Sequence, residues 1–170
     1  MKIISKTNWK NFNRPDIRTI CSDYFLPQPE LLEPGVNKEE ALLIVQKALG
    51  VDITNPKIEI ITPIGTVNIQ NHYLPHIVEK RESARERFTN YILPALQSPF
   101  EIYNAAYEDN KERLQYIGLF KGGTNMLVVV EVLLSHPFLF WNMMQTDMKR
   151  LNSHRRGELI WYKKNALPNQ

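Results

Sequence analysis

The sequence predicts an α+β fold in which helices pack on one face of a four- to five-stranded antiparallel sheet, with a helical N-terminal extension. Residues 1–56 contain two helix signals, at 16–26 and 38–49, and the pattern changes to β-type runs after them. Such runs begin at residue 57 and, after one helical stretch, recur in the pattern of a meander. Strands grouped together after helices are typical of α+β domains. We therefore expect a helical extension over residues 1–56 and an α+β domain over 57–170.

The extension contains one strong and one weaker helix signal. Residues 38–49 place apolar side chains at helical spacing, and Asn37 and Gly50 are good cap residues on either side. Residues 16–26 form the weaker candidate, which the following proline would end. The prolines between the two helices make 27–36 the best candidate linker.

The predicted domain begins with a hairpin and a long helix. Two β-type runs, at 57–61 and 66–70, flank a turn that contains proline and glycine. Pro75 suits the first turn of a helix, which we expect over residues 76–93.

A β meander is predicted to follow this helix. Turn residues, among them Ser135-His136-Pro137, separate the β-type runs. These runs are 101–107, 113–120, 126–134, 138–144 and 158–163. The apolar centre of the third run, at 128–130, predicts a central strand buried on both faces.

The composition excludes several classes of protein. A single cysteine, Cys21, cannot form an internal disulfide, and we interpret it as a small buried thiol. The longest apolar stretch, 126–134, has nine residues and contains Glu131, so no membrane span is expected. The N-terminus lacks the apolar core of a signal peptide. These features predict a cytoplasmic protein, while delivery by a phage or conjugative element stays open.

The net charge of +3 is small, but it is unevenly distributed. Residues 76–170 carry thirteen basic and ten acidic side chains, whereas residues 1–75 carry eight of each. This placement predicts that the basic side chains of the second part line one groove that meets a polyanion. A solvated basic face is the alternative.

A helical wheel of residues 76–91 gathers polar side chains beside the apolar face. His76, Lys80, Ser83 and Arg87 fall within about 60° of one another at 100° per residue. An imidazole and cations aligned in this way can bind a phosphate and exchange a proton with it. A generic charged helix with solvated side chains is the alternative interpretation.

Three other patterns have weaker functional meaning. His72 and His76 have the spacing of metal ligands, but the intervening proline and the lack of a third ligand argue against a metal site. The turn at 121–124 lacks the spacing of a P-loop and suits a hairpin whose Lys121 projects over a sheet. His154 lies in a basic segment, where it contacts a phosphate or is simply a loop histidine.

Several stretches between residues 63 and 162 carry a family resemblance, in order. TPIGTVNIQNHYLPHIVEKR is similar to a hairpin leading to a histidine at a helix start. RERFTNYILPALQSPFEIY is similar to a helix-borne arginine followed by an acidic strand start. YIGLFKG and LVVVEV are similar to a central hairpin, and FWNMMQTD and RRGELIWY to closing elements. By these stretches the segment resembles the phage-associated nuclease-like domains of the barnase–EndoU–colicin–RelE superfamily.

The resemblance implies a set of site residues. The implied catalytic residues are His76, Arg87, Glu101, Lys121 and Thr146. Thr146 departs from the family pattern because Asp147-Met148 follows it where aromatic residues are usual. The basic segments supply candidate substrate-binding residues, which are Lys80, His154, Arg155 and Arg156.

The resemblance also implies an activity, namely that of a metal-independent endoribonuclease without cofactors. Its 2′-hydroxyl attack would use His76 as proton carrier, with Arg87 and Lys80 or Lys121 stabilising the phosphate. Glu101 would act as a partner acid or base, or orient Arg87. We expect a toxin or an effector of a phage or other mobile element, with RNA, including tRNA, as substrate and an immunity protein, antitoxin or phage structural protein as partner.

Two alternatives remain open on the sequence. A non-catalytic module on the same fold would bind nucleic acid or a protein. Residues 1–56 would, on a further interpretation, attach the chain to a delivery or capsid protein.

Overall fold

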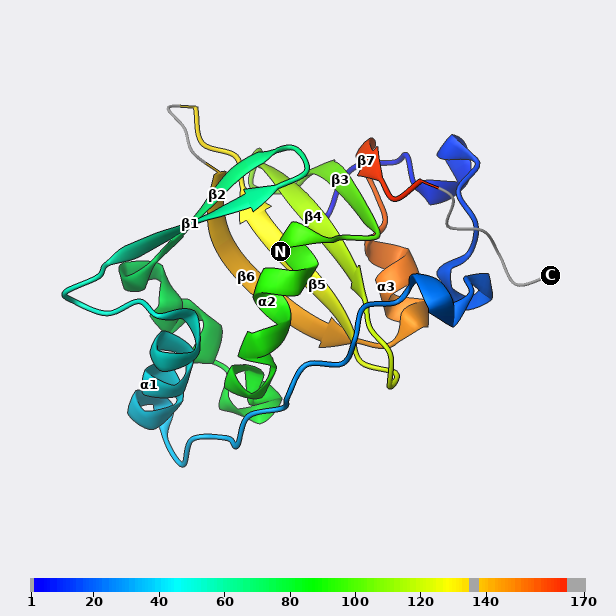
Figure 1. Cartoon of the computed structure of the whole chain (residues 1–170). Helices are drawn as coiled ribbons and strands as arrows, with labels where there is room; N and C mark the ends of the chain where they lie inside the picture. Colours follow the sequence, from blue (N-terminus) through cyan, green and yellow to red (C-terminus); the bar gives the residue numbers. More distant parts are fainter. Residues whose placement is uncertain (1, 135–137, 165–170) are drawn as a thin grey trace.

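The computed structural model of the chain describes residues 2–134 and 138–164. In this part, seven strands form one sheet in the order β1-β2-β6-β5-β4-β3-β7 (Figure 1). The strands are β1 (Lys57–Thr62), β2 (Gly65–Gln70), β3 (Glu101–Ala106), β4 (Glu112–Leu119), β5 (Asn125–Glu131), β6 (Phe138–Thr146) and β7 (Glu158–Tyr162). Neighbouring strands are antiparallel except β2 and β6, which pair in parallel. The predicted turn at Ser135-His136-Pro137 and the end of the predicted domain at 165–170 lie outside the described residues.

Three α-helices and several 3-10 turns accompany the sheet in the described residues. The α-helices are α1 (Lys38–Leu49), α2 (Ile92–Gln97) and α3 (Met148–His154). The 3-10 turns are η1 (Trp9–Phe12), η2 (Ile17–Thr19), η3 (Ser22–Tyr24), η4 (Asn71–Val78), η5 (Arg81–Ser83) and η6 (Arg85–Tyr91). None of these helices has the length and apolar character needed to cross a membrane.

Helix α1 has the bounds that its sequence predicts. The Asn37 side chain accepts a hydrogen bond of 2.8 Å from the backbone N–H of Glu40, and Gly50 ends the helix in the left-handed conformation. Ala41, Val45 and Leu49 are buried, which is the i, i+4 spacing of a single helix face. This face packs on the η4 and η6 segments and contributes to the larger core.

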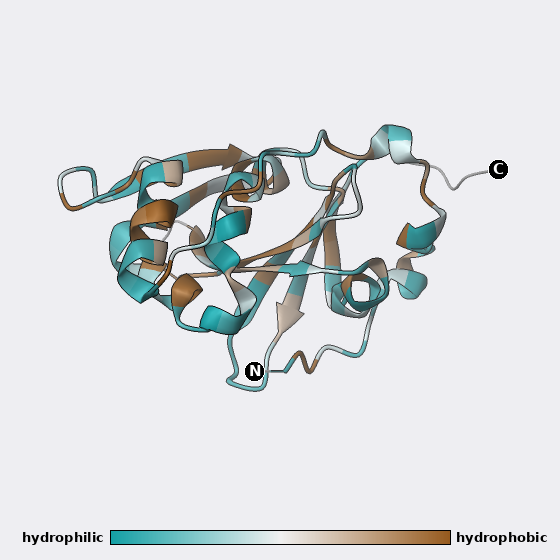
Figure 2. Ribbon diagram, turned by 90° about the horizontal axis from the view of Figure 1, so that it is seen from below, coloured by the Kyte–Doolittle hydropathy of each residue, from teal (hydrophilic) through white to brown (hydrophobic). Residues whose placement is uncertain are grey.

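The two faces of the sheet support two cores. Helix α2 lies across one face of the sheet (Figure 1). The larger core on this face includes the buried side chains of α2 together with Tyr116, Val128 and Met143. Hydrophobic and hydrophilic residues alternate along the helices and the strands (Figure 2). Leu127 points to the other core, so β5 is buried on both faces as predicted.

The second core lies under the N-terminal segment and α3. Ile17 and Ile20 of this segment, with Leu151 of α3, cover Tyr103 and Leu127 on the sheet. This cover does not extend over the whole face, and a cavity remains above β5 and β6.

The α+β class is confirmed, but the predicted sheet of four to five antiparallel strands is wrong in size and in strand direction. The β1–β2 hairpin joins the meander through parallel pairing of Val67 with Phe138. Alternating patterns mark each strand but do not specify which distant strand it pairs with. The second face is also covered in part, so packing is not restricted to one face.

Two predicted helices are also corrected. Residues 16–26 form only the short turns η2 and η3, the first of them capped by Asp16. The helix expected over 76–93 is divided into 3-10 segments before α2, because Lys80 has an extended backbone and Ala84 a left-handed one with φ of 40°. A wheel that assumes one continuous helix therefore loses its phase at Lys80 and again at Ala84.

Residues 27–36 follow an extended path tied to the η6 segment. The Leu32 N–H donates to the Arg87 carbonyl at 3.0 Å. The Gly35 N–H donates to a carboxylate oxygen of Glu86 at 3.1 Å, and Arg81 also binds this carboxylate. Burial opposes ionisation of Glu86, but hydrogen bonds from Arg81 and from backbone N–H groups lower its pKa overall.

Candidate active site

A cavity of about 600 Å³ opens on the sheet face opposite α2. Leu127 and Val129 of β5 and Met144 of β6 contribute apolar lining. Basic groups and histidines contribute most of the charged lining, namely Lys2, His76, Lys80, Arg85, Arg113, His154 and Arg156. Glu79 is the one carboxylate among the described lining residues. The cavity is therefore strongly cationic.

The η4 segment presents His76 to this cavity. The larger core buries Leu74, Ile77 and Val78 of the same segment. The opposite side of η4 therefore faces the cavity. The His76 ring packs against Trp141, with centroids 5.0 Å apart. Its Nδ1 lies 3.2 Å from a Glu79 carboxylate oxygen, so Nε2 is the nitrogen left for a substrate.

Arg85 reaches the cavity because of the backbone at Ala84. The left-handed residue turns the chain between η5 and η6. The Arg85 Nη1 donates a hydrogen bond of 2.8 Å to Asn142 Oδ1 on β6. Burial lowers the pKa of Arg85, yet a guanidinium keeps its charge at neutral pH. Lys80, which precedes η5, adds a second cation from the same segment.

His154 and Arg156 enter the lining from the end of α3. Burial lowers the pKa of the His154 imidazole, and the nearby Arg156 charge lowers it further. Both causes favour the neutral imidazole, which can accept a proton at neutral pH. Arg156 is exposed, and its backbone pairs with Asn8 of the N-terminal segment.

Tyr107 and Arg113 line the cavity from the β3–β4 region. The Arg113 guanidinium lies over the Tyr107 ring at 4.8 Å and binds Asp109 at 2.7 Å. Burial raises the pKa of Tyr107 to about 12, so its hydroxyl stays protonated and can donate a hydrogen bond.

Four of the predicted site residues line the cavity together, namely His76, Lys80, His154 and Arg156. The other five, which are Arg87, Glu101, Lys121, Thr146 and Arg155, do not line it. The Arg87 Nε donates to the Leu32 carbonyl at 3.3 Å. Lys121 is exposed in the β4–β5 turn, and Thr146 is buried at the end of β6 opposite Asn125.

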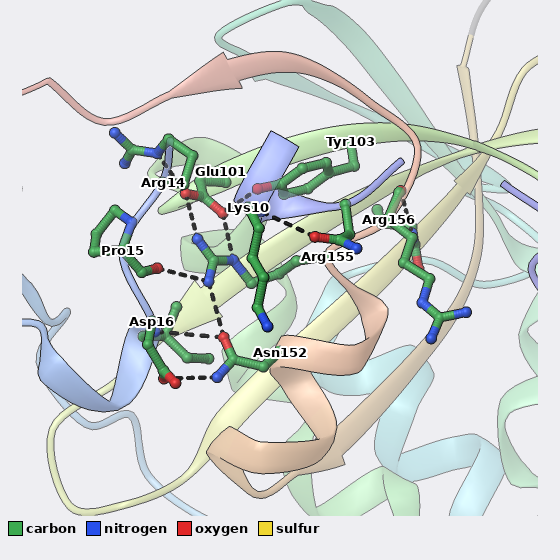
Figure 3. A network of polar contacts seen from close by, with 12 residues as sticks. Lys10, Arg14, Pro15, Asp16, Glu101, Tyr103, Asn152, Arg155 and Arg156 are labelled. Atoms are coloured by element: carbon green, nitrogen blue, oxygen red, sulfur yellow. Dashed lines mark hydrogen bonds and ion pairs between the residues drawn. The ribbon is translucent and has the colours of Figure 1, made fainter. Parts of the chain in front are cut away.

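Glu101 and Arg155 form the centre of a buried ion network (Figure 3). Both side chains are fully buried, and Arg155 donates two hydrogen bonds, of 2.7 and 2.8 Å, to the Glu101 carboxylate. Arg14 Nε donates to the same carboxylate at 2.7 Å, and the Tyr103 hydroxyl donates at 2.8 Å. Arg155 also binds the Pro15 carbonyl at 2.9 Å. The network thus joins the N-terminal segment to β3 and to the end of α3.

Sequence reasoning missed Arg85, Tyr107, Arg113 and Trp141 as lining residues. The alternation of β4 contains a usable signal for one of them, because Arg113 shares a strand face with Ile117 of the second core. No comparable signal marks Arg85, since its position depends on the backbone at Ala84.

The arrangement suits chemistry at a phosphodiester. Histidines from two separate elements, η4 and α3, can exchange protons with a bound group. Arg85, Lys80 and Arg156 can bind the phosphate oxygens as negative charge develops on them.

Neither the curated proteins nor the solved structures include a significant match to this chain. A family model, PBECR2, described as phage-Barnase-EndoU-ColicinE5/D-RelE like nuclease2, matches residues 45–162. The match runs from within α1 to the end of β7 and includes every cavity-lining residue except those of the N-terminal segment. The family supports a nuclease function for the chain. On this match over more than half of its length, the chain belongs to the PBECR2 family of phage-associated nuclease-like domains.

Proposed function

We propose that this chain is a metal-independent endoribonuclease whose active site is the cationic cavity above β5 and β6. The observation that carries the proposal is the placement of His76 and His154, from two separate elements, in one cavity with Arg85, Lys80 and Arg156. Two imidazoles can supply the general base and the general acid that cleavage of RNA by its own 2′-hydroxyl uses, and cations can stabilise the charge on the phosphate.

The two histidines have different roles in the proposed reaction. The neutral His154 accepts the proton of the 2′-hydroxyl, because its pKa is lowered. The 2′-oxygen forms a bond to phosphorus, and the bond to the 5′-oxygen breaks. His76 delivers a proton to that leaving oxygen. The products are a 2′,3′-cyclic phosphate and a 5′-hydroxyl end.

The cations stabilise the charge that develops on the phosphate. Arg85 replaces Arg87 in this role, because Arg85 lines the cavity and Arg87 binds the Leu32 carbonyl. Lys80 and Arg156 add charge from two other segments. The single carboxylate in the described lining offers poor ligands for a divalent cation, which supports a reaction without a metal.

Cleavage assays in EDTA test this proposal. We expect His76→Ala and His154→Ala each to lower the rate on mixed RNA by about 10²–10⁴-fold. His72→Ala is the matched control, because His72 is exposed in the same η4 segment and does not line the cavity. Equal rates for all four proteins would overturn the proposal, as would loss of all activity in EDTA with recovery on adding a divalent cation.

A non-catalytic module is the second candidate function. The Trp141 ring beside His76 and the cationic lining would also suit nucleic-acid binding without turnover. Salt-dependent RNA binding by the wild-type protein without any cleavage product would favour this candidate.

The biological setting that we propose follows from the phage association of the family. The enzyme would act on cytoplasmic RNA, including tRNA, as a toxin or as an effector of a phage or other mobile element. An immunity protein or antitoxin would then be its partner in the producing cell. Co-purification of an inhibitory protein expressed from the neighbouring reading frame tests this setting.

A further inference from the structure

A second cavity, of about 390 Å³, adjoins the active site at the end of α3. The two cavities share Ser153 and Arg156 in their lining. The remaining residues of the second lining come from the N-terminal segment and α3, and are Asn8, Trp9, Lys10, Asp16, Arg18, Lys149 and Asn152. Family membership rests on residues 45–162, so the part of this lining that comes from residues 8–18 lies outside the segment that defines the family.

The second cavity carries uncompensated positive charge. Arg18 is neutralised, because its guanidinium binds Asp16 through several hydrogen bonds. Lys10 and Lys149 are exposed, and neither forms an ion pair within residues 2–134 and 138–164. Lys10 lies 5.4 Å from the centroid of the Trp9 ring, which restricts its position. Arg156 lines both cavities and so connects the positive charge of the second cavity with that of the first.

The ion network of Figure 3 extends to two residues that line the second cavity, Asp16 and Asn152. Asn152 Nδ2 donates to Asp16 Oδ1 at 2.7 Å, while its Oδ1 accepts from Arg155 at 2.8 Å. These contacts hold the N-terminal segment against α3, so Lys10 and Lys149 face the same cavity from two different elements. Two cations that face one cavity attract an anionic group to it.

We infer that the second cavity binds the phosphate of a neighbouring nucleotide, so that the substrate is a single RNA strand crossing from one cavity to the other over Arg156. This inference rests on the proposed function of the first cavity. A polynucleotide strand presents anionic groups at regular intervals, and two adjoining cationic cavities with shared lining match that pattern. The enzyme then prefers oligonucleotides to dinucleotides.

Binding measurements with a catalytically impaired protein test the inference. The probes are a fluorescein-labelled dinucleotide and a labelled single-stranded RNA of about eight nucleotides, within the range of strand-binding sites. Full-length His76→Ala protein is compared with the same protein carrying Lys10→Gln and Lys149→Gln. We expect affinity for the longer strand to fall about tenfold, with a smaller fall for the dinucleotide and a weaker salt dependence.

Lys47→Gln with Lys57→Gln is the matched control, because both lysines are exposed and line neither cavity. Equal losses for the two lysine pairs, or an unchanged salt dependence, would overturn the inference.

The two proposals can fail separately. If the protein cleaves no RNA but still prefers the longer strand, and this preference depends on Lys10 and Lys149, only the ribonuclease proposal is rejected. Cleavage with binding that is independent of Lys10 and Lys149 would reject only the second subsite.

Discussion

Glu101, predicted from the sequence to be a catalytic acid, belongs in the structure to a buried ion network. Its carboxylate is fully buried and is bound by Arg14, Arg155 and Tyr103. A buried carboxylate between two guanidiniums keeps those charges compensated. The sequence around Glu101 resembles the acidic strand start of the nuclease family. That resemblance does not reveal that the carboxylate is buried.

We expect Glu101→Gln to destabilise the fold, because the amide leaves the buried Arg155 charge without its counter-ion. The free energy of unfolding, measured with urea, should fall by about 3–5 kcal/mol. Glu158→Gln, at an exposed position of β7, is the control and should change little. If Glu101→Gln kept full stability and lost cleavage activity, the residue would have a catalytic role after all.

The ionisation of His154 gives a second test at the scale of single residues. Arg156 is one of the two causes that lower the His154 pKa. Arg156→Gln should therefore raise that pKa, and the neutral form that accepts the proton would be lost at a higher pH. The acid limb of the kcat/KM profile should move to higher pH. An NMR titration of the His154 ring measures the shift directly, and an unmoved titration would contradict this role of Arg156.

At the scale of elements, the break at Ala84 has the largest effect on the site. A residue with a side chain is uncommon at a φ of 40°, because its Cβ crowds the following carbonyl. The turn moves Arg85 into the cavity and directs Arg87 toward Leu32.

Substitutions at Ala84 should show whether the left-handed backbone at this residue is strained. Glycine tolerates the left-handed region, so Ala84→Gly should raise the free energy of unfolding by up to about 1 kcal/mol. Ala84→Val should lower it by about 1–2 kcal/mol, because a branched side chain is least compatible with this backbone. Urea unfolding measures both. A valine variant as stable as the glycine variant would show that the turn carries no strain.

Elements with local signals could be predicted from the sequence, and those set by distant contacts could not. The caps of α1, Asn37 and Gly50, lie next to the helix they bound, and the β1–β2 turn lies between its own strands. The parallel pairing of Val67 with Phe138 joins strands far apart in the chain. For the same reason the sequence placed His76, Lys80, His154 and Arg156 as functional candidates without showing that Arg85 completes their cavity.

At the scale of the whole molecule, the N-terminal segment and the sheet both contribute to the second core. Ile17 is fully buried with Tyr103 and Leu151, although it belongs to the predicted extension. Basic side chains of the second part also gather at the cavity, but others lie elsewhere, such as Lys111, which binds Glu131. The predicted groove of basic residues is thus built from a subset of them.

We expect the N-terminal segment to unfold together with the sheet. Ile17→Ala should lower the free energy of unfolding by about 2–4 kcal/mol, because it leaves a cavity in the second core. Ile53→Ala, at a position 90% exposed, should change it little. One transition seen by both tryptophan fluorescence and circular dichroism is expected. Two separate transitions, with Ile17→Ala affecting only the first, would show that the segment folds by itself.

The parallel pairing of β2 with β6 also determines when, during translation, the cavity can form. β2 cannot find its neighbour until residue 138 has left the ribosome, and the cavity lacks His154 and Arg156 until still later. Contacts between distant residues form late and slowly in folding. The growing chain therefore assembles this cavity only after residue 156 has been synthesised and can pack beside β5 and β6.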